Sequence, residues 1–400
     1  MDFRLSEDDR MLQQSVRDYI ENSANKVWRE IEKTGTIPPS LIEEAKQLGL
    51  LGLSIPDSLI EEAKELGLLG LSIPEQYGGV GFSVVQKALV HEMLGRGPWG
   101  LSSFISVHTG LGCVGIVRFA SEAQKQRYLP KMAKGEWIGS FALTEPNAGS
   151  DAGAMQSTAV QKGDEWILNG TKTFITNAPK AHHFMVFART QKGISAFIVD
   201  RESPGMRIGQ VFETIGHRGS KPAEIVMEDC RVPKDALVGE EGKGFDYAKR
   251  TLAEGRTTLA SRCVGTAQKA LELALEYAMQ RKTFGTPLAE HQALAFRFAE
   301  MSARTEASRL CVYRSAWLLD RGQPAIRESS TAKLVGGEWS WQTVDECFQI
   351  FGGNAYISQE YMIERLWRDL RVARIYDGSS EVQQIVISQQ LRKGNVQTPW

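Results

Sequence analysis

The acidic residue Asp377 stands where a carboxylate could act as a base. It comes just before a flexible Gly-Ser-Ser turn at 378–380. The residues after this turn recur with helical spacing, namely Val382, Ile385 and Val386. A carboxylate on a turn at the entrance of a helix can reach into a cleft, and it accepts a proton there when water is excluded. We therefore predict that Asp377 is a general base.

Two segments in the middle of the chain could hold a flat heterocyclic ring. Residues 141–151 (FALTEPNAGSD) offer the hydroxyls of Thr144 and Ser150 and a turn with exposed backbone N–H groups. Phe174 and Thr176 are two residues apart, and on an alternating strand both would lie on one face. A ring could then pack on Phe174 while Thr176 bonds its edge. The alternatives are an ordinary polar turn, and a solvent-facing Thr beside a core Phe.

Two predicted helix ends could hold phosphates and a nucleoside. Arg281 and Lys282 lie at the C-terminal end of a long helical pattern, with Gly285 as its stop. Arg281 could bind a pyrophosphate through two parallel hydrogen bonds, or the two cations could only complement the helix dipole. Residues 348–355 (FQIFGGNA) predict a second helix end, whose Gly-Gly turn either lets a ligand approach the backbone or is an ordinary C-cap.

These segments belong to a chain that is helical at both ends. Apolar residues recur every three or four positions up to about residue 137 and again from about residue 244. Between 138 and 243, short apolar runs alternate with Gly, Asn and Pro, which indicates strands and turns. We predict an α+β protein with domains at 1–137, 138–243 and 244–400, and a β-hairpin that turns at Asn169-Gly170.

Composition excludes several classes of function. The chain has 400 residues, a net charge of -1 and five scattered cysteines, so nothing favours nucleic acid as a partner or a zinc site. We expect no metal, and we expect His182-His183 to be an exposed turn pair. No run of 18 apolar residues and no signal or transit pattern is seen. We therefore expect no membrane span and a cytoplasmic location, in a bacterial cytosol.

Residues 40–57 recur almost unchanged at 58–75. Two copies do not make a repeat fold, so we interpret them as a local tandem duplication, natural or engineered. We predict that one copy packs in the core and that the other is an extra helical excursion on the surface.

Residues 110–115 match the Gly-x-Gly-x-x-Gly pattern of dinucleotide-binding proteins. That motif requires a preceding strand, whereas residues 101–109 lie in a helical region. We interpret these glycines as sites where helices approach closely.

Six segments together resemble the acyl-CoA dehydrogenase family in their order, spacing and α–β–α context. They are FALTEPNAGSD, WILNGTKTFITN, HRGSKPAEIVMEDCRVP, QRKTFGTPLAEHQ, QIFGGNAY and RIYDGSSEVQ. The resemblance runs over nearly the whole chain, from about Leu5 to Leu391. It implies an N-terminal helical domain, a middle domain with a β-barrel-like or orthogonal sheet, and a C-terminal four-helix bundle.

The resemblance also implies FAD as the cofactor. Thr144 and Thr176 would hydrogen-bond its isoalloxazine ring, and Phe174 would pack on that ring. Arg281 and its neighbours would hold the FAD pyrophosphate of an adjacent subunit. The whole implied cofactor set is Phe141, Leu143, Thr144, Ser150, Phe174, Thr176, Arg281, Thr283, Phe284, Gln349, Gly353, Ser379 and Glu381. The implied substrate set is Ser150, Phe104, Val107, His108, Arg256, Tyr376 and Gly378, although a core histidine is the alternative for His108.

The implied reaction is oxidation of an acyl-CoA thioester to the 2-enoyl-CoA, with Asp377 as base and Arg256 beside it. The family usually has Glu at this position, and Asp draws the carboxylate back by about 1.5 Å. We therefore expect a short, branched or alicyclic acyl group. Some family members carry the base just before the arginine that matches Arg256, where this chain has Gly255. Glu254 is one step away from that position and is the weaker candidate.

Two other functions remain open. One is a flavin oxidase of acyl-CoA or of a carbon acid such as a nitroalkane. The other is a non-catalytic protein that binds acyl-CoA or an acyl carrier. For the dehydrogenase, the resemblance implies an electron-transfer flavoprotein as electron acceptor and a homotetramer built as a dimer of dimers.

Overall fold

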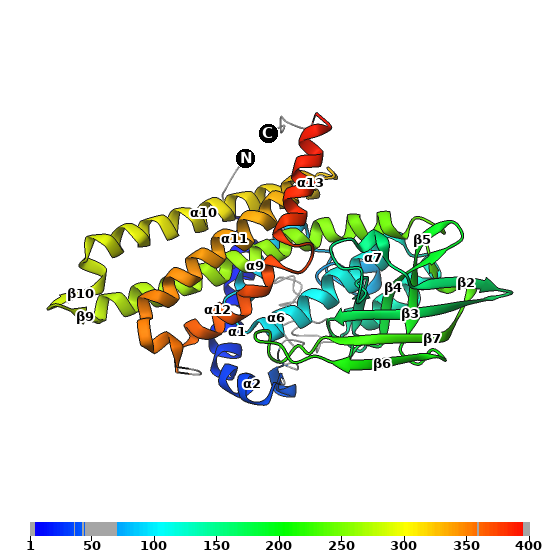
Figure 1. Cartoon of the computed structure of the whole chain (residues 1–400), viewed down its shortest axis with the longest axis horizontal. Helices are drawn as coiled ribbons and strands as arrows, with labels where there is room; N and C mark the ends of the chain where they lie inside the picture. The colour runs from blue at the N-terminus through cyan, green and yellow to red at the C-terminus, as the bar shows by residue number, and fades with distance from the viewer. Residues whose placement is uncertain (1–4, 36, 42–43, 45–69, 358–359, 395–400) are drawn as a thin grey trace.

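The computed structural model describes residues 5–35, 37–41, 44, 70–357 and 360–394. Figure 1 shows an elongated molecule with a sheet at one end and long helices that reach the other end. Shorter helices from the first part of the chain lie between them. The predicted order of helices, then strands, then helices is confirmed.

The helices that precede the sheet begin with polar caps. The Ser6 hydroxyl accepts a hydrogen bond from the Asp9 N–H at the start of α1, and Ser83 and Gln86 form a capping box on α5. Between α6 and α7 the chain makes one π-helical turn, η3, a feature often found at functional sites. The bounds are α1 (Glu7–Asn22), η1 (Ala24–Lys26), α2 (Trp28–Thr34), η2 (Glu75–Tyr77), α5 (Val84–Leu94), α6 (Trp99–Ser106), η3 (Val107–Leu111), α7 (Gly112–Phe119) and α8 (Glu122–Ala133).

The middle region is a mixed sheet of eight strands in the order β6-β7-β3-β2-β4-β5-β8, with β1 paired in parallel to β4. Its inner face is apolar and includes Trp166, Phe184 and Phe197. The bounds are β1 (Gly139–Ala142), η4 (Ala152–Ala154), β2 (Thr158–Lys162), β3 (Glu165–Ile175), β4 (His183–Thr190), β5 (Gly193–Asp200), β6 (Met206–Val211), β7 (Ala223–Pro233), η5 (Lys234–Ala236) and β8 (Leu237–Val238).

The predicted hairpin at Asn169-Gly170 is wrong, because β3 runs straight through this dipeptide. The pairing of β3 with β7 shifts its register between Leu168 and Gly170, so the dipeptide marks a bulge. The Asn169 side-chain carbonyl accepts a hydrogen bond from the Asp229 N–H at 2.8 Å, which ties the bulge to β7. A side chain at position 170 would collide with Ser157, so glycine is required there by close contact as well as by conformation.

The C-terminal region consists of long helices, of which α11 packs against α9, α10 and α13. Its two-stranded ribbon, β9–β10, projects at the far end from the sheet (Figure 1). The bounds are α9 (Gly244–Gln280), β9 (Lys282–Thr283), β10 (Thr286–Pro287), η6 (Leu288–Glu290), α10 (Gln292–Asp320), α11 (Ile326–Phe351), η7 (Gly352–Tyr356), α12 (Met362–Leu370), η8 (Arg371–Arg374) and α13 (Ser380–Arg392).

Helices α5 and α9 touch through their backbones at two glycines. A side chain on Gly95 would lie 2.0 Å from the Arg262 carbonyl oxygen, and one on Gly265 would lie 1.8 Å from that of Glu92. Neither position can therefore hold any other residue without separating the helices. This contact fixes α9, which carries Glu254, Arg256 and Arg262, relative to the N-terminal region.

Three further expectations can be placed. The prediction about residues 40–57 and 58–75 lies largely outside the described residues, which include only the start of the first copy and the end of the second.

The glycines at 110–115 differ in their surroundings. Gly112 meets the backbone of Gly139 and Gly115 meets Met185, as close packing requires, whereas Gly110 has open space around it. Within the described ranges, the stretch Trp99–Phe119 has the length and apolar composition to cross a membrane, but most of it is buried inside the protein, which is the pattern of a core helix.

Candidate active site

Asp377 lies between η8 and α13, at the entrance of that helix. The helix begins at the end of the Gly-Ser-Ser turn, as the sequence pattern predicts, and Ser379 caps it by accepting a hydrogen bond from the Val382 N–H. Asp377 has a φ of 53° and Gly378 a φ of 86°, so the backbone is left-handed at two successive residues. Such a conformation costs energy at a non-glycine residue and persists only where the surroundings impose it.

Three helices hold this backbone in place. Lys333 of α11 donates a hydrogen bond to the Gly378 carbonyl at 2.7 Å, and Gln383 of α13 donates to the same oxygen at 2.7 Å. Arg256 of α9 donates to the Asp377 carbonyl at 3.3 Å. Lys333 and Gln383 are buried, so these bonds are shielded from water. The backbone that carries the carboxylate is thus held by contacts from α9, α11 and α13 together.

Three positively charged side chains act on the single carboxylate of Asp377. Burial raises the pKa of its carboxyl above the ordinary 3.8, although Lys333, Arg262 and Arg256 each act to lower it. Burial also lowers the pKa of Lys333, against the attraction of Asp377. A carboxylate whose pKa is raised by dry surroundings is a stronger base than one in water.

Sequence reasoning missed Lys333, Gln383 and Arg262. Lys333 is a lone cation in the run Ala332-Lys333-Leu334-Val335, and Arg262 stands in Ala260-Ser261-Arg262-Cys263-Val264. A single cation inside an apolar helical run is a signal that it has a buried partner, because an unpaired buried charge is costly. The identity of that partner depends on the tertiary fold.

Tyr376, which precedes the base, is connected to α6 through Arg262. Arg262 donates to the Tyr376 hydroxyl at 2.7 Å and to the Ser103 hydroxyl at 3.3 Å. Ser103 is followed by Phe104, a predicted pocket residue, which is buried. The Phe104 carbonyl accepts a hydrogen bond from the Asn177 side chain at 3.1 Å, so α6 also meets the end of β3.

The other two predicted pocket residues differ in their surroundings. Val107 is half-buried at the start of the π turn η3. His108 is buried, its Nδ1 accepts a hydrogen bond from the Gly139 N–H at 3.2 Å, and its Nε2 lies 3.1 Å from the Met132 carbonyl. Since backbone groups occupy both ring nitrogens, this geometry favours the core alternative for His108.

The loop after β1 is fixed by a buried ion pair. Lys172 is fully buried and donates to Glu145 at 2.8 Å and to the Leu143 carbonyl at 3.2 Å. Thr144 lies between these two partners, and its carbonyl accepts from the Thr173 N–H at 2.9 Å. Phe141 is half-buried, whereas Ser150, at the other end of the loop, is exposed. The loop is therefore rigid around Thr144 and open at Ser150.

The end of β3 departs from simple alternation. The register with β7 shifts between Lys172 and Ile175, and Phe174 has a φ of 58°. The segment is therefore bulged and not a regular strand, and the expectation that Phe174 and Thr176 share a face stays a prediction. Phe174 is nevertheless 63% exposed, with only Phe212 as a neighbouring ring, at 5.1 Å. An exposed phenylalanine in a strained conformation leaves one ring face free for a ligand.

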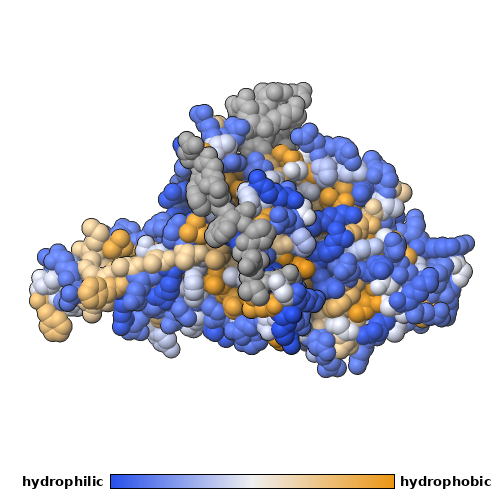
Figure 2. Space-filling model, turned by 90° about the horizontal axis from the view of Figure 1, so that it is seen from above, coloured by the Kyte–Doolittle hydropathy of each residue, from blue (hydrophilic) through white to orange (hydrophobic). Residues whose placement is uncertain are grey.

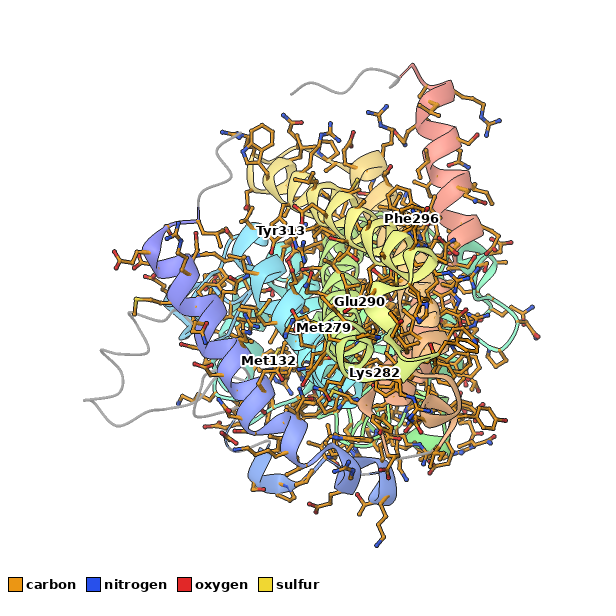
Figure 3. The ribbon with its side chains drawn as sticks, turned by 90° about the vertical axis from the view of Figure 1, so that its left-hand side faces the viewer. Met132, Met279, Lys282, Glu290, Phe296 and Tyr313 are labelled. Carbon is orange, nitrogen blue, oxygen red and sulfur yellow. The ribbon has the colours of Figure 1, made fainter. Side chains whose placement is uncertain are left out.

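Four of the other predicted cofactor residues lie far from the loop after β1. Arg281, Phe284, Gln349 and Gly353 are exposed, with Phe284 102% exposed. In Figure 3 the labelled Met279, Lys282 and Phe296 mark this end of α9 and α10. Figure 1 places β9–β10 at the opposite end of the molecule from β2 and β7. One chain therefore does not bring these residues to Thr144 and Phe174.

The β9–β10 turn corrects one prediction. Helix α9 ends at Gln280 and Arg281 is already extended, so Gly285 does not stop the helix. Gly285, at φ 81°, and Phe284, at φ 52°, are instead the two central residues of a tight hairpin turn. The Thr283 hydroxyl lies 3.1 Å from His291 Nε2. The predicted helix end at Phe351, followed by the Gly-Gly turn, is confirmed.

Glu254 is engaged in other contacts. It is buried and forms ion pairs with Lys87 and with Arg118, the latter at 2.5 Å. Burial alone would raise its pKa, but Lys87 and Arg118 bring the pKa below the ordinary value. A carboxylate stabilised in this way is a weak base and has a structural partner on each side.

No group of three or more residues in the described ranges could hold a metal ion. The expectation of an exposed His182-His183 pair is half wrong, because His183 is buried at the start of β4 and packs on Tyr128. Burial lowers the pKa of His183 to about 3. A surface hollow among Gln161, Trp166 and Lys192 contains none of the predicted site residues.

Known proteins with this arrangement identify the family. Sequence profiles described as acyl-CoA dehydrogenase match residues 6–59 and 54–136 (N-terminal domain), 140–230 (middle domain) and 242–392 (C-terminal domain). The mitochondrial short-chain specific acyl-CoA dehydrogenase of Homo sapiens is 39% identical over 389 residues, which cover 96% of this chain and 90% of that protein. This chain belongs to the acyl-CoA dehydrogenase family.

Solved structures agree with this assignment. Butyryl-CoA dehydrogenase from Megasphaera elsdenii has a TM-score of 0.90 and 34% identity, over 98% of this chain and 100% of that one. A chain from work on the electron transferring flavoprotein of Acidaminococcus fermentans has a TM-score of 0.90 and 37% identity, over 98% and 99%. PigA, solved with FAD and proline, has a TM-score of 0.89 and 30% identity, over 98% and 99%. The chain is thus an FAD-dependent oxidoreductase of acyl-CoA thioesters.

The residues of this acyl-CoA dehydrogenase fit FAD. Phe174 offers a free ring face beside Thr176, and the loop around Thr144 is held rigid by Lys172 and Glu145. At the other end, Gly352 and Gly353 face open space, which leaves room for a ligand against the backbone. FAD, when bound, supplies the hydride acceptor.

Proposed function

We propose that this chain dehydrogenates a short, branched or alicyclic acyl-CoA, with Asp377 as the base. The Cα–H bond breaks and its proton goes to Asp377, while the Cβ–H bond breaks and its hydrogen leaves with the electron pair to FAD. The two carbons are then joined by a double bond. The observation that carries this proposal is the half-buried Asp377 carboxylate, whose pKa is raised by desolvation despite three neighbouring cations.

The short side chain supports a compact acyl group. Asp is one methylene shorter than the usual Glu, so its carboxylate is drawn back by about 1.5 Å. A displacement of about 1 Å can cost about 100-fold in rate unless the substrate moves to compensate. Because three helices fix the backbone of Asp377, the compensation must come from the substrate lying closer.

The surrounding cations support the same step. Removal of the α-proton leaves negative charge on the thioester, and Arg256 and Lys333, two cations that act on Asp377, would stabilise that charge electrostatically. Glu254 is committed to Lys87 and Arg118, which supports Asp377 over Glu254 as the base.

We further propose that the chain works as a homotetramer, passes its electrons to an electron-transfer flavoprotein and resides in the cytoplasm. The exposed residues of the ribbon support a second copy, because Phe284 lies fully in solvent and Met279 is 64% exposed. In Figure 2 the narrow end that carries β9 and β10 shows a band of apolar atoms. Arg281 of one copy would then reach the FAD of another.

The test is anaerobic bleaching of the bound flavin with straight, branched and cyclic acyl-CoAs. We expect bleaching by at least one short thioester and formation of the 2-enoyl product. Peroxide formation in air without an added acceptor would favour the flavin oxidase. Binding of the thioesters with no bleaching at all would favour the non-catalytic protein and overturn the proposal.

A further inference from the structure

Arg262 is the least explained buried charge near the base. It lies on α9, is 3% exposed, and its guanidinium stacks over the Trp99 ring at 4.4 Å. It donates one hydrogen bond to Ser103 and one to Tyr376, while its Nε has no hydrogen-bond partner. A guanidinium has five N–H donors, so three of them are left without a described acceptor.

Arg96, a buried arginine further along the same region, has carboxylate partners that Arg262 lacks. It is also 3% exposed, but it forms ion pairs with Glu21 at 3.0 Å and Glu272 at 2.6 Å. Among the described residues, no carboxylate lies within ion-pair distance of Arg262. Burying a charge without a partner costs several kcal/mol, which indicates that Arg262 is kept for a ligand.

A chain of hydrogen bonds fixes the direction of Arg262. The Ser103 hydroxyl accepts from Arg262 and lies 3.1 Å from His217 Nδ1, to which it can donate. His217 Nε2 then donates to the Asp369 carbonyl, at 3.2 Å. Burial keeps this imidazole neutral by lowering the pKa of His217 to about 3. The guanidinium is therefore held rigidly between α6 and the base loop.

The neighbours of Arg262 connect it to the predicted acyl pocket and to the proposed base. One partner, Ser103, precedes the predicted pocket residue Phe104, and the other, Tyr376, precedes the base. Arg256, Arg262 and Lys333 surround a single carboxylate, Asp377, so the site carries more positive than negative charge. A hydrocarbon tail would leave the free N–H groups of Arg262 desolvated, whereas an oxygen acceptor would satisfy them.

We propose that Arg262 determines specificity by binding an oxygen acceptor, preferably a carboxylate, at the far end of a short acyl group. This inference rests on the proposed dehydrogenation of an acyl-CoA. It refines the substrate class, because a short, branched or cyclic acyl group with an oxygen at its end meets both requirements. A planar guanidinium binds a carboxylate through two parallel hydrogen bonds, which a methyl group cannot replace.

The test compares glutaryl-CoA with pentanoyl-CoA, which have five acyl carbons each and end in a carboxylate or a methyl group. Initial rates of flavin reduction give kcat/KM for each thioester. We expect wild type to prefer glutaryl-CoA, R262Q to lower the glutaryl-to-pentanoyl ratio about 10- to 100-fold, and R262K to restore part of it. R250Q, which removes an exposed arginine from the same helix, is the matched control and should leave the ratio unchanged.

Binding provides a readout that does not depend on turnover. In the D377N background, calorimetric titration should show that R262Q weakens binding of glutaryl-CoA and not of pentanoyl-CoA. An equal ratio in wild type and R262Q, with flavin reduction intact, overturns the role of Arg262 and leaves the proposed function standing. If neither these thioesters nor any other acyl-CoA reduces the flavin, the proposed function itself fails.

Discussion

The site around Asp377 and the β9–β10 ribbon differ in how many contacts a single chain provides for their predicted functional residues. Asp377 is half-buried, and its backbone is held by side chains of α9, α11 and α13, of which Lys333 and Gln383 are buried. Arg281 and Phe284, at the tip of the molecule, are exposed and face no described residue that would explain them. The comparison teaches that a single chain brings together the groups around the proposed base, whereas the proposed grip of Arg281 on FAD needs the second copy that we propose.

The sharpest test of the site around Asp377 is the substitution D377N. The amide keeps the size of the side chain but cannot accept the α-proton, so kcat should fall by about 10²- to 10⁴-fold. FAD content should not change, because D377N leaves Arg281 and the β9–β10 ribbon unchanged. In wild type, kcat/KM should fall as the pH drops through the pKa of Asp377, which lies above 3.8, since only the ionised form is a base. Full activity of D377N would show that the base lies elsewhere.

Removing Arg281 tests the proposed role of the β9–β10 ribbon in FAD binding. R281A should weaken FAD binding by about 10- to 100-fold, because a bidentate charge-assisted contact is lost. Excess FAD should restore turnover, since Asp377 is unchanged. Flavin fluorescence measures the binding, and R297A, which removes another exposed arginine near this end, is the control. Unchanged FAD affinity in R281A would contradict a shared cofactor site.

Lys333 is a positioning residue in the site around Asp377. K333M removes the hydrogen bond to Gly378 and one cation beside Asp377, so kcat should fall by about 10- to 100-fold. Loss of the cation disfavours the ionised carboxylate and should raise the pKa of Asp377 further. The acid limb of the kcat/KM profile should then move to higher pH. A merely structural role would leave that limb in place, and K333R should rescue most of the effect.

Glu254 of α9 should contribute to the stability of the fold and not to the chemical step. E254Q should change kcat by no more than about threefold, because this carboxylate is already paired. It should lower the free energy of unfolding by on the order of 3 kcal/mol, since Lys87 loses its charged partner. Urea denaturation measures this change. A loss of turnover comparable to that of D377N would assign the base to Glu254.

The sequence predicted the elements better than it predicted the contacts. The Gly-Ser-Ser turn and the apolar spacing after it located Asp377 at the start of α13, because these signals are local. Asn169-Gly170 is also a local signal, yet it failed because pairing of β3 with β7 outweighs a turn preference. Lys333, Gln383 and Arg262 were missed because their partners lie on other elements, at distances along the chain that no spacing rule covers.

The glycine contacts between α5 and α9 limit how this scaffold can acquire new substrates. With Gly95 and Gly265 against the backbone of the opposite helix, α9 can neither slide nor rotate to enlarge the space around Arg262. Relatives that accept larger or less polar acyl groups must therefore differ through side-chain replacements on an unmoved framework. Engineering of substrate range should accordingly begin with libraries at position 262 and its neighbours, and should leave both glycines untouched.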